Sequence, residues 1–550
     1  MNKKAGMSRR GFLGGALATA GAAGFALAGC SGDEKSEGTP SPGSTKAPVG
    51  EPKKGGTIRS YSPAAILSLD PMETSGVSTA TYFYSYVVHP TDWYKPGTPL
   101  EGGKTWPTPT IGDLATAWET PTPIDWIFHI RSDAVFQNVP PANGRKLVAE
   151  DIVKSIDRYR KMPGASTAWD QWTDKYEAPD PTTFTILTKA PYGYMLMDLG
   201  SPLTAIIPIE AVDQLGDLKS QAVGSGPYML KSYARDQGME VVRHPGYYHK
   251  YPYVDGISIK VLPDDSSVQA AYRAGSIDYY TAADKIRADS VQGVAGTSVQ
   301  KFLDRVYAVF TVNALKNEAF KDIRVREAID LAIDRKAMMD KLHFGDAELA
   351  GPVPPLWPAT LPAAEIEEAY KLDVNKAKQL LAAANQENLT FNLEFGTTGD
   401  FADRASIIKE NLAKAGITVN LKPSEIGTWL GALMAGNFES TSYRHLRYLS
   451  DYIQINSAHS HGWARTEAGY LGVDNDEIDA MLDKINGTTD ELERTKLEQD
   501  AQRVILKQHG PNFVLYEPYA YWAAYNYLKG YTPTSYGFGL YKYDYWIDKG

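Results

Sequence analysis

Residues 389–421, LTFNLEFGTTGDFADRASIIKENLAKAGITVNL, contain the pattern that decides the fold class. Apolar residues alternate with polar ones at 389–395 and again at 417–421, as they do in strands with one buried face. Between these runs, Ile408, Leu412 and Ala415 share one face of a helix. A strand, a helix and a second strand predict a crossover unit, and therefore an α/β protein.

Outward from this unit, the spacing predicts three more helices. Asp373 is placed to cap a helix with apolar residues at 377–384. A second helix has its apolar face at 478–485, and a third begins at Thr488-Thr489-Asp490-Glu491, which has a capping-box pattern. The expected buried face of the third helix consists of Leu497, Ala501, Val504 and Ile505.

Another helical segment begins at Asp322. Its apolar stripe consists of Val325, Ala328, Ile329, Ala332 and Ile333. The charged residues between them are expected to form exposed ion pairs on the other faces of a well-capped core helix. These residues are Arg324, Arg326, Glu327, Asp334 and Arg335.

The first 29 residues have the anatomy of an export signal, with a basic start, an apolar middle and small residues at the end. Ser8-Arg9-Arg10-Gly11-Phe12-Leu13 resembles a twin-arginine motif, and the uncharged run from Gly11 to Gly29 is short for a membrane span. Leu27-Ala28-Gly29-Cys30 resembles the bacterial lipobox, whose cysteine receives a diacylglycerol and becomes the new N-terminus. An ordinary secretory signal with a cysteine nearby is the alternative.

The segment after Cys30, at 31–54, is rich in Gly, Ser, Thr, Pro, Lys and Glu, and it predicts a flexible tether. Lipid on Cys30 would hold the protein at a membrane while the folded body stays in water, outside the cytoplasm. No second long apolar run follows in the sequence, which excludes further spans.

The amino-acid composition limits the classes of function expected for the folded part of the chain after the tether. Cleavage before Cys30 removes four of the 56 basic residues and no acidic one, leaving 52 against 66 and a net charge of −14. This balance indicates that nucleic acid is not a partner. Roughly 500 residues without a disulfide must be held by burial, which favours two or more lobes. The 34 tyrosines and 11 tryptophans suit a ligand cleft as well as a core.

Catalytic motifs are missing from the sequence. The segment 224–228, Gly-Ser-Gly-Pro-Tyr, is not a nucleophile elbow, because Val223 stands where the elbow needs glycine. The segment predicts a sharp turn before a strand at 228–230, with glycines that are free to take positive φ. The sequence contains no HExxH, Gly-x-Ser-x-Gly or P-loop motif. Asp264 and Asp265 fit a turn at the end of a strand better than a catalytic acid and base, because neighbours on a strand point to opposite faces. We expect a protein that is not an enzyme and needs no cofactor; an exported hydrolase is the alternative of another class.

Short motifs follow one another in a characteristic order along the body. They are Gly55-Gly56-Thr57-Ile58, Leu69-Asp70-Pro71, Trp118-Glu119, Phe128-His129-Ile130-Arg131, Ala149-Glu150-Asp151-Ile152-Val153, the 224–228 turn, Pro245-Gly246-Tyr247-Tyr248, Asp255-Gly256-Ile257, Gly275-Ser276-Ile277-Asp278 and the Asp322 segment. The ordered set resembles the oligopeptide-, dipeptide- and nickel-binding lipoproteins that serve ABC importers, family 5 of the bacterial extracellular solute-binding proteins.

The resemblance implies a two-lobed clamshell with mixed sheets and a subdomain inserted into lobe one, which closes over a small solute and hands it unchanged to a permease. It implies an export signal at 1–29 and a lipidated tether at 30–52. Lobe one would comprise 53–86, 205–308 and 525–550, the inserted subdomain 87–204, and lobe two 309–524. Crossings near 308 and 525 would form the hinge, and a monomer is expected.

The resemblance also suggests ligand-binding residues for a peptide. Asp451, in the pair Asp451-Tyr452, matches the aspartate that in peptide-binding members pairs with the amino terminus, although the usual proline does not follow at 453–456. Trp429, Tyr443, Trp463 and Tyr82 are candidate aromatic residues of the cleft. An oligosaccharide or a metal complex is the alternative ligand, the latter because His459-Ser460-His461 and His445 have some metal-like character.

Overall fold

The computed structural model describes residues 51–73, 76–90, 110–162, 172–249, 252–304, 306–353, 355, 359–397, 399–446, 471–530 and 545–549. The helices among them are α1 (Val77–Phe83), α2 (Ala149–Tyr159), α4 (Met195–Leu199), η2 (Pro202–Thr204), α5 (Ile209–Leu215), α6 (Asp265–Arg273), α7 (Lys285–Val291), η3 (Glu318–Lys321), α8 (Ile323–Ala332), α9 (Arg335–His343), α10 (Ala363–Ala369), α11 (Val374–Ala383), α12 (Phe401–Lys414), α13 (Ile426–Met434), α15 (Asp476–Gly487) and α16 (Glu491–Gln508). Within this part of the chain, every helix is too short or too polar to cross a membrane.

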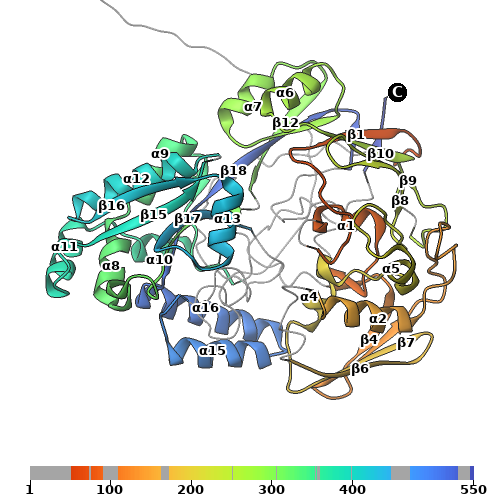
Figure 1. Ribbon diagram of the computed structural model, residues 1–550, viewed down its shortest axis with the longest axis horizontal. Helices are drawn as coiled ribbons and strands as arrows, with labels where there is room; N and C mark the ends of the chain where they lie inside the picture. The colour runs from red at the N-terminus through yellow and green to blue at the C-terminus, as the bar shows by residue number, and fades with distance from the viewer. Residues whose placement is uncertain are drawn as a thin grey trace, which may run out of the picture. The chain divides into compact units, whose positions relative to one another are not determined.

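The strands form several mixed or antiparallel sheets (Figure 1). One has the order β1-β10-β9-β8, and a second is the antiparallel sheet β4-β5-β7-β6. The largest has the order β11-β18-β13-β17-β15-β16, with β12 and β14 also paired to β18. Pairs β2-β3 and β19-β20 complete the described strands. The bounds are β1 (Thr57–Ser62), β2 (Val88–Pro90), β3 (Thr110–Gly112), β4 (Ala115–Glu119), β5 (Asp125–Ile130), β6 (Thr173–Asp180), β7 (Thr183–Thr188), β8 (Tyr228–Ala234), β9 (Gly238–Arg243), β10 (Gly256–Val261), β11 (Tyr279–Ala282), β12 (Thr297–Leu303), β13 (Val306–Val312), β14 (Ala347–Glu348), β15 (Thr390–Gly396), β16 (Thr418–Ser424), β17 (Ser440–Leu446), β18 (Asn512–Tyr525), β19 (Leu528–Lys529) and β20 (Trp546–Ile547).

The predicted crossover unit is confirmed. Strands β15 and β16 pair in parallel, with Phe391 opposite Val419, and α12 connects them. Ile408 and Leu412 of α12 are fully buried in the same core as Phe391 and Leu393. The alternating and helical patterns at 389–421 therefore identify the two faces correctly, because each is set by the period of its own element.

The other expected helices also form, with one change of cap. Asp373 caps α11 by accepting a hydrogen bond from the backbone N–H of Lys376 at 2.8 Å. The cap of α16 is Asp490, which accepts from the N–H of Glu493, rather than a residue of the Thr488-Thr489 pair. An aspartate at the N-cap accepts a hydrogen bond from a backbone N–H that has no partner in the helix, and its negative charge is stabilised by the positive end of the helix dipole.

Helix α8 buries the predicted stripe, but its arginine neighbours are not all on the surface. Val325, Ala328 and Ile329 are fully buried, as expected. Arg326, in contrast, is buried at 4% exposure, and its guanidinium donates to the carbonyl oxygens of Gln508 and His509 at the end of α16. Carbonyls at the C-terminus of a helix lack partners within the helix, so a buried arginine can satisfy them. The expected helical segment breaks after Ala332, and Arg335 begins the next helix, α9. Arg335 is buried too, pairing with Asp330, so the expectation of exposed ion pairs was wrong for these two arginines.

The glycines of the 224–228 turn have a different role from the one expected. The strand β8 begins at Tyr228, as predicted, but neither Gly224 nor Gly226 has positive φ. A Cβ on Gly224 would lie 2.0 Å from the carbonyl oxygen of Phe83, and one on Gly226 would lie 2.6 Å from the backbone of Phe83 and Tyr84. Glycine is required here because two backbones approach closely.

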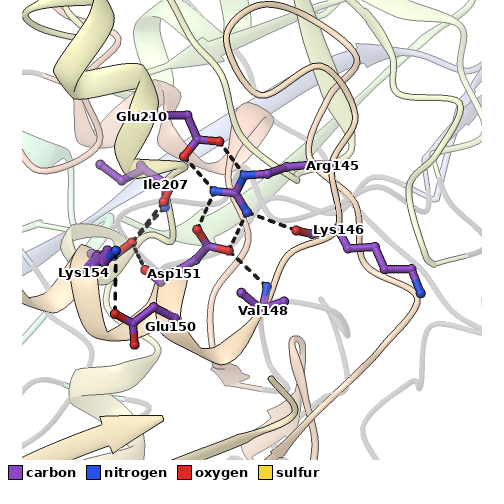
Figure 2. A network of polar contacts seen from close by, with 9 residues as sticks. Arg145, Lys146, Val148, Glu150, Asp151, Lys154, Ile207 and Glu210 are labelled. Carbon is purple, nitrogen blue, oxygen red and sulfur yellow. Dashed lines mark hydrogen bonds and ion pairs between the residues drawn. The ribbon is translucent and has the colours of Figure 1, made fainter. Parts of the chain in front are cut away.

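Aspartates from three of the ordered motifs are buried acceptors for arginines. Asp70 binds both terminal nitrogens of Arg158. Asp278 binds Arg59 of β1. In the third case, Figure 2 shows the guanidinium of Arg145 between two carboxylates: Asp151 at 2.6 and 2.8 Å, and Glu210 at the start of α5. Such bidentate pairs fix relative geometry, so the contacts of Arg158 and Arg145 fasten α2 to the chain before 86 and after 205.

Candidate ligand-binding site

Strand β18 connects two parts of the largest sheet. Its first residues pair with β13, with Phe513 opposite Phe310, and its last residues pair with β12, with Tyr519 opposite Leu303 (Figure 1). Strands β12 and β13 are consecutive in the chain, so two chain segments pass between the same two parts of the sheet. They are joined there by a hydrogen bond from the N–H of Asp304 to the carbonyl oxygen of Pro518, 2.9 Å long.

Next to this passage, two arginines share one carboxylate. Asp400 lies just before α12, and its Oδ2 accepts from Nη1 of Arg404, one turn along the helix, at 3.2 Å. Its Oδ1 accepts from Nε of Arg444 on β17, also at 3.2 Å. Tyr516 of β18 donates its hydroxyl to Asp400 at 3.2 Å. Elements far apart in the chain therefore meet at this carboxylate.

Burial and charge oppose each other in this cluster. Burial alone would raise the pKa of the Asp400 carboxyl, but the charges of Arg404 and Arg444 outweigh it and hold that pKa well below its usual range. Burial lowers the pKa of nearby His343 to about 4, in spite of the attraction of Asp400, so His343 is neutral at pH 7. The cluster thus has two cations for one shared carboxylate, and a second carboxylate, Asp304, also acts on Arg444.

The two arginines differ in access. The Arg404 side chain is fully buried and also donates to Ser442 Oγ at 2.8 Å. The Arg444 side chain is 27% exposed, and β17 ends two residues later, just before the segment that contains Asp451. Arg444 is therefore the more exposed arginine of the pair, while Arg404 holds Asp400 from inside the core.

An apolar face lies on the opposite side of the same strands. Tyr307 and Val309 of β13 and Val514 of β18 form a small buried cluster, against which Tyr443 of β17 packs. Successive residues of a strand point to opposite faces, so Tyr443 and Arg444 lie on different sides of the sheet. Tyr443, one of the expected cleft aromatics, is half-buried.

Two other expected cleft aromatics lie inside cores. Trp429 of α13 is 4% exposed, contacts the Phe401 ring at a tilted angle and donates its Nε1–H to Thr441 Oγ1 at 3.1 Å. Tyr82 of α1 is 4% exposed and meets the ring of Tyr228 edge-on. Little of either ring is available to a solute in this structure, and their binding roles stay predictions.

The remaining expected site residues lie outside the described part of the chain: Asp451, Tyr452, Trp463, His459, His461 and Cys30. The side chain of His445 is likewise not described. Among the residues that the structure describes, no three His, Cys, Asp or Glu side chains are placed to hold a metal ion.

Sequence reasoning missed the Asp400 cluster. One signal was available: Asp400 and Arg404 are four residues apart at the start of a helix, a spacing that favours an ion pair. Nothing in the sequence indicates that Arg444 and Tyr516 join them, because that contact arises only when β17 and β18 are placed in the sheet.

Comparison with known proteins agrees with this architecture. Residues 110–455 match the family model of the bacterial extracellular solute-binding proteins, family 5 (middle part). A probable D,D-dipeptide-binding periplasmic protein of Escherichia coli is 26% identical over 80% of this chain and 84% of its own length. A heme-binding protein of Haemophilus influenzae is 26% identical over 77% of this chain and 82% of its own.

Solved structures show the same fold. A periplasmic binding protein of Helicobacter pylori associated with an ABC transporter, in complex with the peptide STSA, superimposes with a TM-score of 0.77 at 23% identity, covering 90% of this chain and 99% of the other. The fold is thus the two-lobed, mixed α/β clamshell of periplasmic binding proteins. The family match spans well over half of the sequence, and the chain belongs to family 5 of the bacterial extracellular solute-binding proteins.

Proposed function

We propose that this protein is the membrane-anchored, extracellular solute-binding component of an ABC importer, which captures a peptide by closing two lobes and delivers it unchanged to a permease. The family match over residues 110–455 is the observation that carries the proposal. It is supported by β18, a strand shared by two parts of the sheet, which provides a connection about which lobes can turn.

We further propose where the lobes divide. Lobe one would comprise 53–86, 205–308 and 525–550, with the subdomain at 87–204, and lobe two would comprise 309–524. The partner change of β18 and the break between β12 and β13 favour a hinge at about 304–306 and 517–519. The first is close to the crossing expected near 308, whereas the second lies about six residues before the one expected near 525 and would place 519–524 in lobe one, with β11 and β12. Closure would then require that the solute bind the closed arrangement better than the open one.

A peptide is the proposed solute because its two charged ends would each find an opposite charge, at Asp451 and at Arg444. Asp451, matched to the family's aspartate, would bind the amino terminus, with Tyr452 next to it in sequence and Trp463 twelve residues later. The partly exposed guanidinium of Arg444 would bind a carboxylate, since guanidinium and carboxylate form paired charge-assisted hydrogen bonds. Tyr443, on the other face of β17, would contribute packing rather than charge.

A thermal-shift screen of di- to pentapeptides, oligosaccharides and nickel–histidine tests the solute class. A peptide at a hundred times its Kd should stabilise the protein by about 2.7 kcal/mol, and mass spectrometry should recover that peptide intact. Stabilisation by sugars or the metal complex alone would replace the peptide proposal, and a cleaved product would indicate a hydrolase. N-acetylation of a bound peptide should weaken its binding to the wild type but not to Asp451→Asn. If acetylation weakens binding to both proteins equally, Asp451 does not bind the amino terminus.

Arg444→Met is expected to weaken peptide binding by roughly 10- to 100-fold, the value of one hydrogen bond to a charged group. The variant keeps the Asp400–Arg404 pair, so the fold should persist. Titration calorimetry with a free and a C-amidated peptide measures the effect: the wild type should prefer the free acid, and the variant should bind both equally. Arg324→Met, which removes an exposed arginine paired with Asp322, is the control. A variant that keeps the preference for the free acid would contradict the role.

Lipid on Cys30 is proposed as the membrane anchor, after export by the twin-arginine or the general secretory route. Replacing Cys30 with Ala should move the protein from the membrane fraction to the soluble fraction of its host, because one or two acyl chains supply the whole affinity for the bilayer. Labelling with a radioactive fatty acid should be lost in the same variant. Protein that stays with the membrane without label would show a different mode of attachment.

A further inference from the structure

Helix α16 is fastened to lobe two through its C-terminal half. Arg326 of α8 donates to the last carbonyls of α16, at 2.7 Å to His509 and 3.2 Å to Gln508. His509 pairs through Nδ1 with Asp330 of α8 at 2.9 Å. Gln502 donates to the carbonyl oxygen of Ala359 at 2.6 Å. These contacts tie the C-terminal end of α16 to α8, while the apolar residues Ala501 and Ile505 of the same half share a buried cluster with residues of the subdomain.

The N-terminal half of α16 contacts the inserted subdomain instead. The Tyr194 hydroxyl donates to the carboxylate of Glu498, and the guanidinium of Arg494 lies over the Tyr194 ring, 4.8 Å from its centre. Arg494 also donates to the carbonyl oxygen of Gly193 at 3.2 Å. The N–H of Gly193 donates to the carbonyl oxygen of Asn486, in α15, at 2.8 Å.

This approach is close. A Cβ on Gly193 would lie 2.3 Å from the carbonyl oxygen of Thr488, so the two backbones touch at this point. Tyr194 and Glu498 are each only 3% exposed. The contact therefore excludes water from both partners, and separating the segments would return the carboxyl group to water.

The subdomain, in turn, is fastened to lobe one. Arg145 links Asp151 of α2 to Glu210 of α5, and Arg158 of α2 binds buried Asp70 (Figure 2 shows the first of these). Subdomain and lobe one therefore move together. The contact of Tyr194 and Gly193 with α15 and α16 thus joins the two halves of the clamshell at a second place, away from β18.

We propose that Glu498 is a proton-dependent latch, whose buried hydrogen bond to Tyr194 holds the subdomain against α16 in the closed arrangement and is broken when the lobes open. This inference rests on the lobe movement of the proposed function. It adds a regulatory role, a preference of the closed form for a proton, that solute binding alone does not require.

The charges around Glu498 set the direction of the effect. Burial raises its pKa to about 7, against the lowering effects of the Tyr194 hydrogen bond and of Arg494, and Glu491 raises it further. Asp198, one turn after Tyr194, is another buried carboxyl in the same segment, and burial raises its pKa to about 6. In the open form, in water, the pKa of Glu498 would return towards 4.5. The closed form then binds a proton that the open form does not, so raising the pH from about 4.5 to 7 weakens closure, and above 7 the effect levels off.

Hydrogen exchange on the full-length protein without solute tests the latch. Peptides covering 190–199 and 486–498 should be protected about tenfold or more better at pH 5 than at pH 8, after correction for intrinsic exchange. Glu498→Gln, which cannot ionise, should be equally protected at both pH values in the 486–498 peptide, where Asp198 does not contribute. Tyr194→Phe, which keeps the ring and removes the donor that favours the carboxylate, should shift the transition to higher pH. Glu493→Gln, an exposed glutamate on the same helix, should behave as the wild type.

Equal protection of the wild type at both pH values would overturn the proposal, as would an unchanged pH dependence in Glu498→Gln or low protection everywhere. Small-angle scattering with and without a bound peptide separates this result from failure of the proposed function. A protein that contracts on binding peptide but shows no titration at 190–199 has lobes without this latch. A protein that titrates there and captures no solute has the latch contact without the proposed function.

Discussion

Asp400→Asn is expected to lower the free energy of unfolding by about 3–5 kcal/mol, because it leaves the fully buried guanidinium of Arg404 without its compensating charge. Urea denaturation followed by circular dichroism measures the change. Because the folded pKa of Asp400 is depressed below its ordinary value of 3.8, the contribution is complete above that pH and is lost as the pH falls further. The difference between wild type and variant should therefore shrink in strong acid.

Asp403→Asn is the matched control, since Asp403 is an exposed aspartate on the first turn of the same helix. It should change stability by less than about 0.5 kcal/mol. A loss below 1 kcal/mol in Asp400→Asn would mean that the two arginines find other partners or water, and that Asp400 does not hold the cluster together.

Gly224→Ala is expected to cost at least about 3 kcal/mol, for a reason of space alone. The new methyl group would lie 2.0 Å from the carbonyl oxygen of Phe83, an approach that only a backbone shift can relieve. Thermal unfolding should show a lowered midpoint. Gly431→Ala is the control: it lies in α13, its Cβ would meet nothing within 4 Å, and it should stabilise by about 0.5–1 kcal/mol. A Gly224→Ala protein as stable as the wild type would show that the contact with Phe83 is easily relaxed.

The parts of the fold that follow from local periodicity could be predicted from the sequence. The crossover unit at 389–421 is one, because the buried faces of β15, α12 and β16 repeat with the period of each element. The stripe of α8 is another, with Val325, Ala328 and Ile329 fully buried. The order of short motifs was enough to recognise the family.

The parts that depend on partners distant in the chain could not be predicted. From the sequence alone, Arg326 is expected on the surface of α8. In the structure it is buried, because the end of α16, about 180 residues later, presents carbonyl oxygens that accept its hydrogen bonds. Gly224 reads as a flexible turn residue until the backbone of Phe83 lies against it. The same holds for the candidate site, where Asp400 and Arg404 have a helical spacing but Arg444 and Tyr516 are brought to them only by the order of strands in the sheet.

Pro518 lies where β18 changes partners, and the lack of an N–H in proline affects how the two lobes of the proposed hinge could rotate. A proline has no N–H, so twisting the backbone at this residue sacrifices no donor of the strand ladder. Its carbonyl oxygen instead holds the neighbouring segment through Asp304. A proposed pivot at this residue would turn beside at least two backbone hydrogen bonds, from Asp304 to Pro518 and from Tyr519 to Asp346, and beside the pairing of Pro518 with Ala347 of β14.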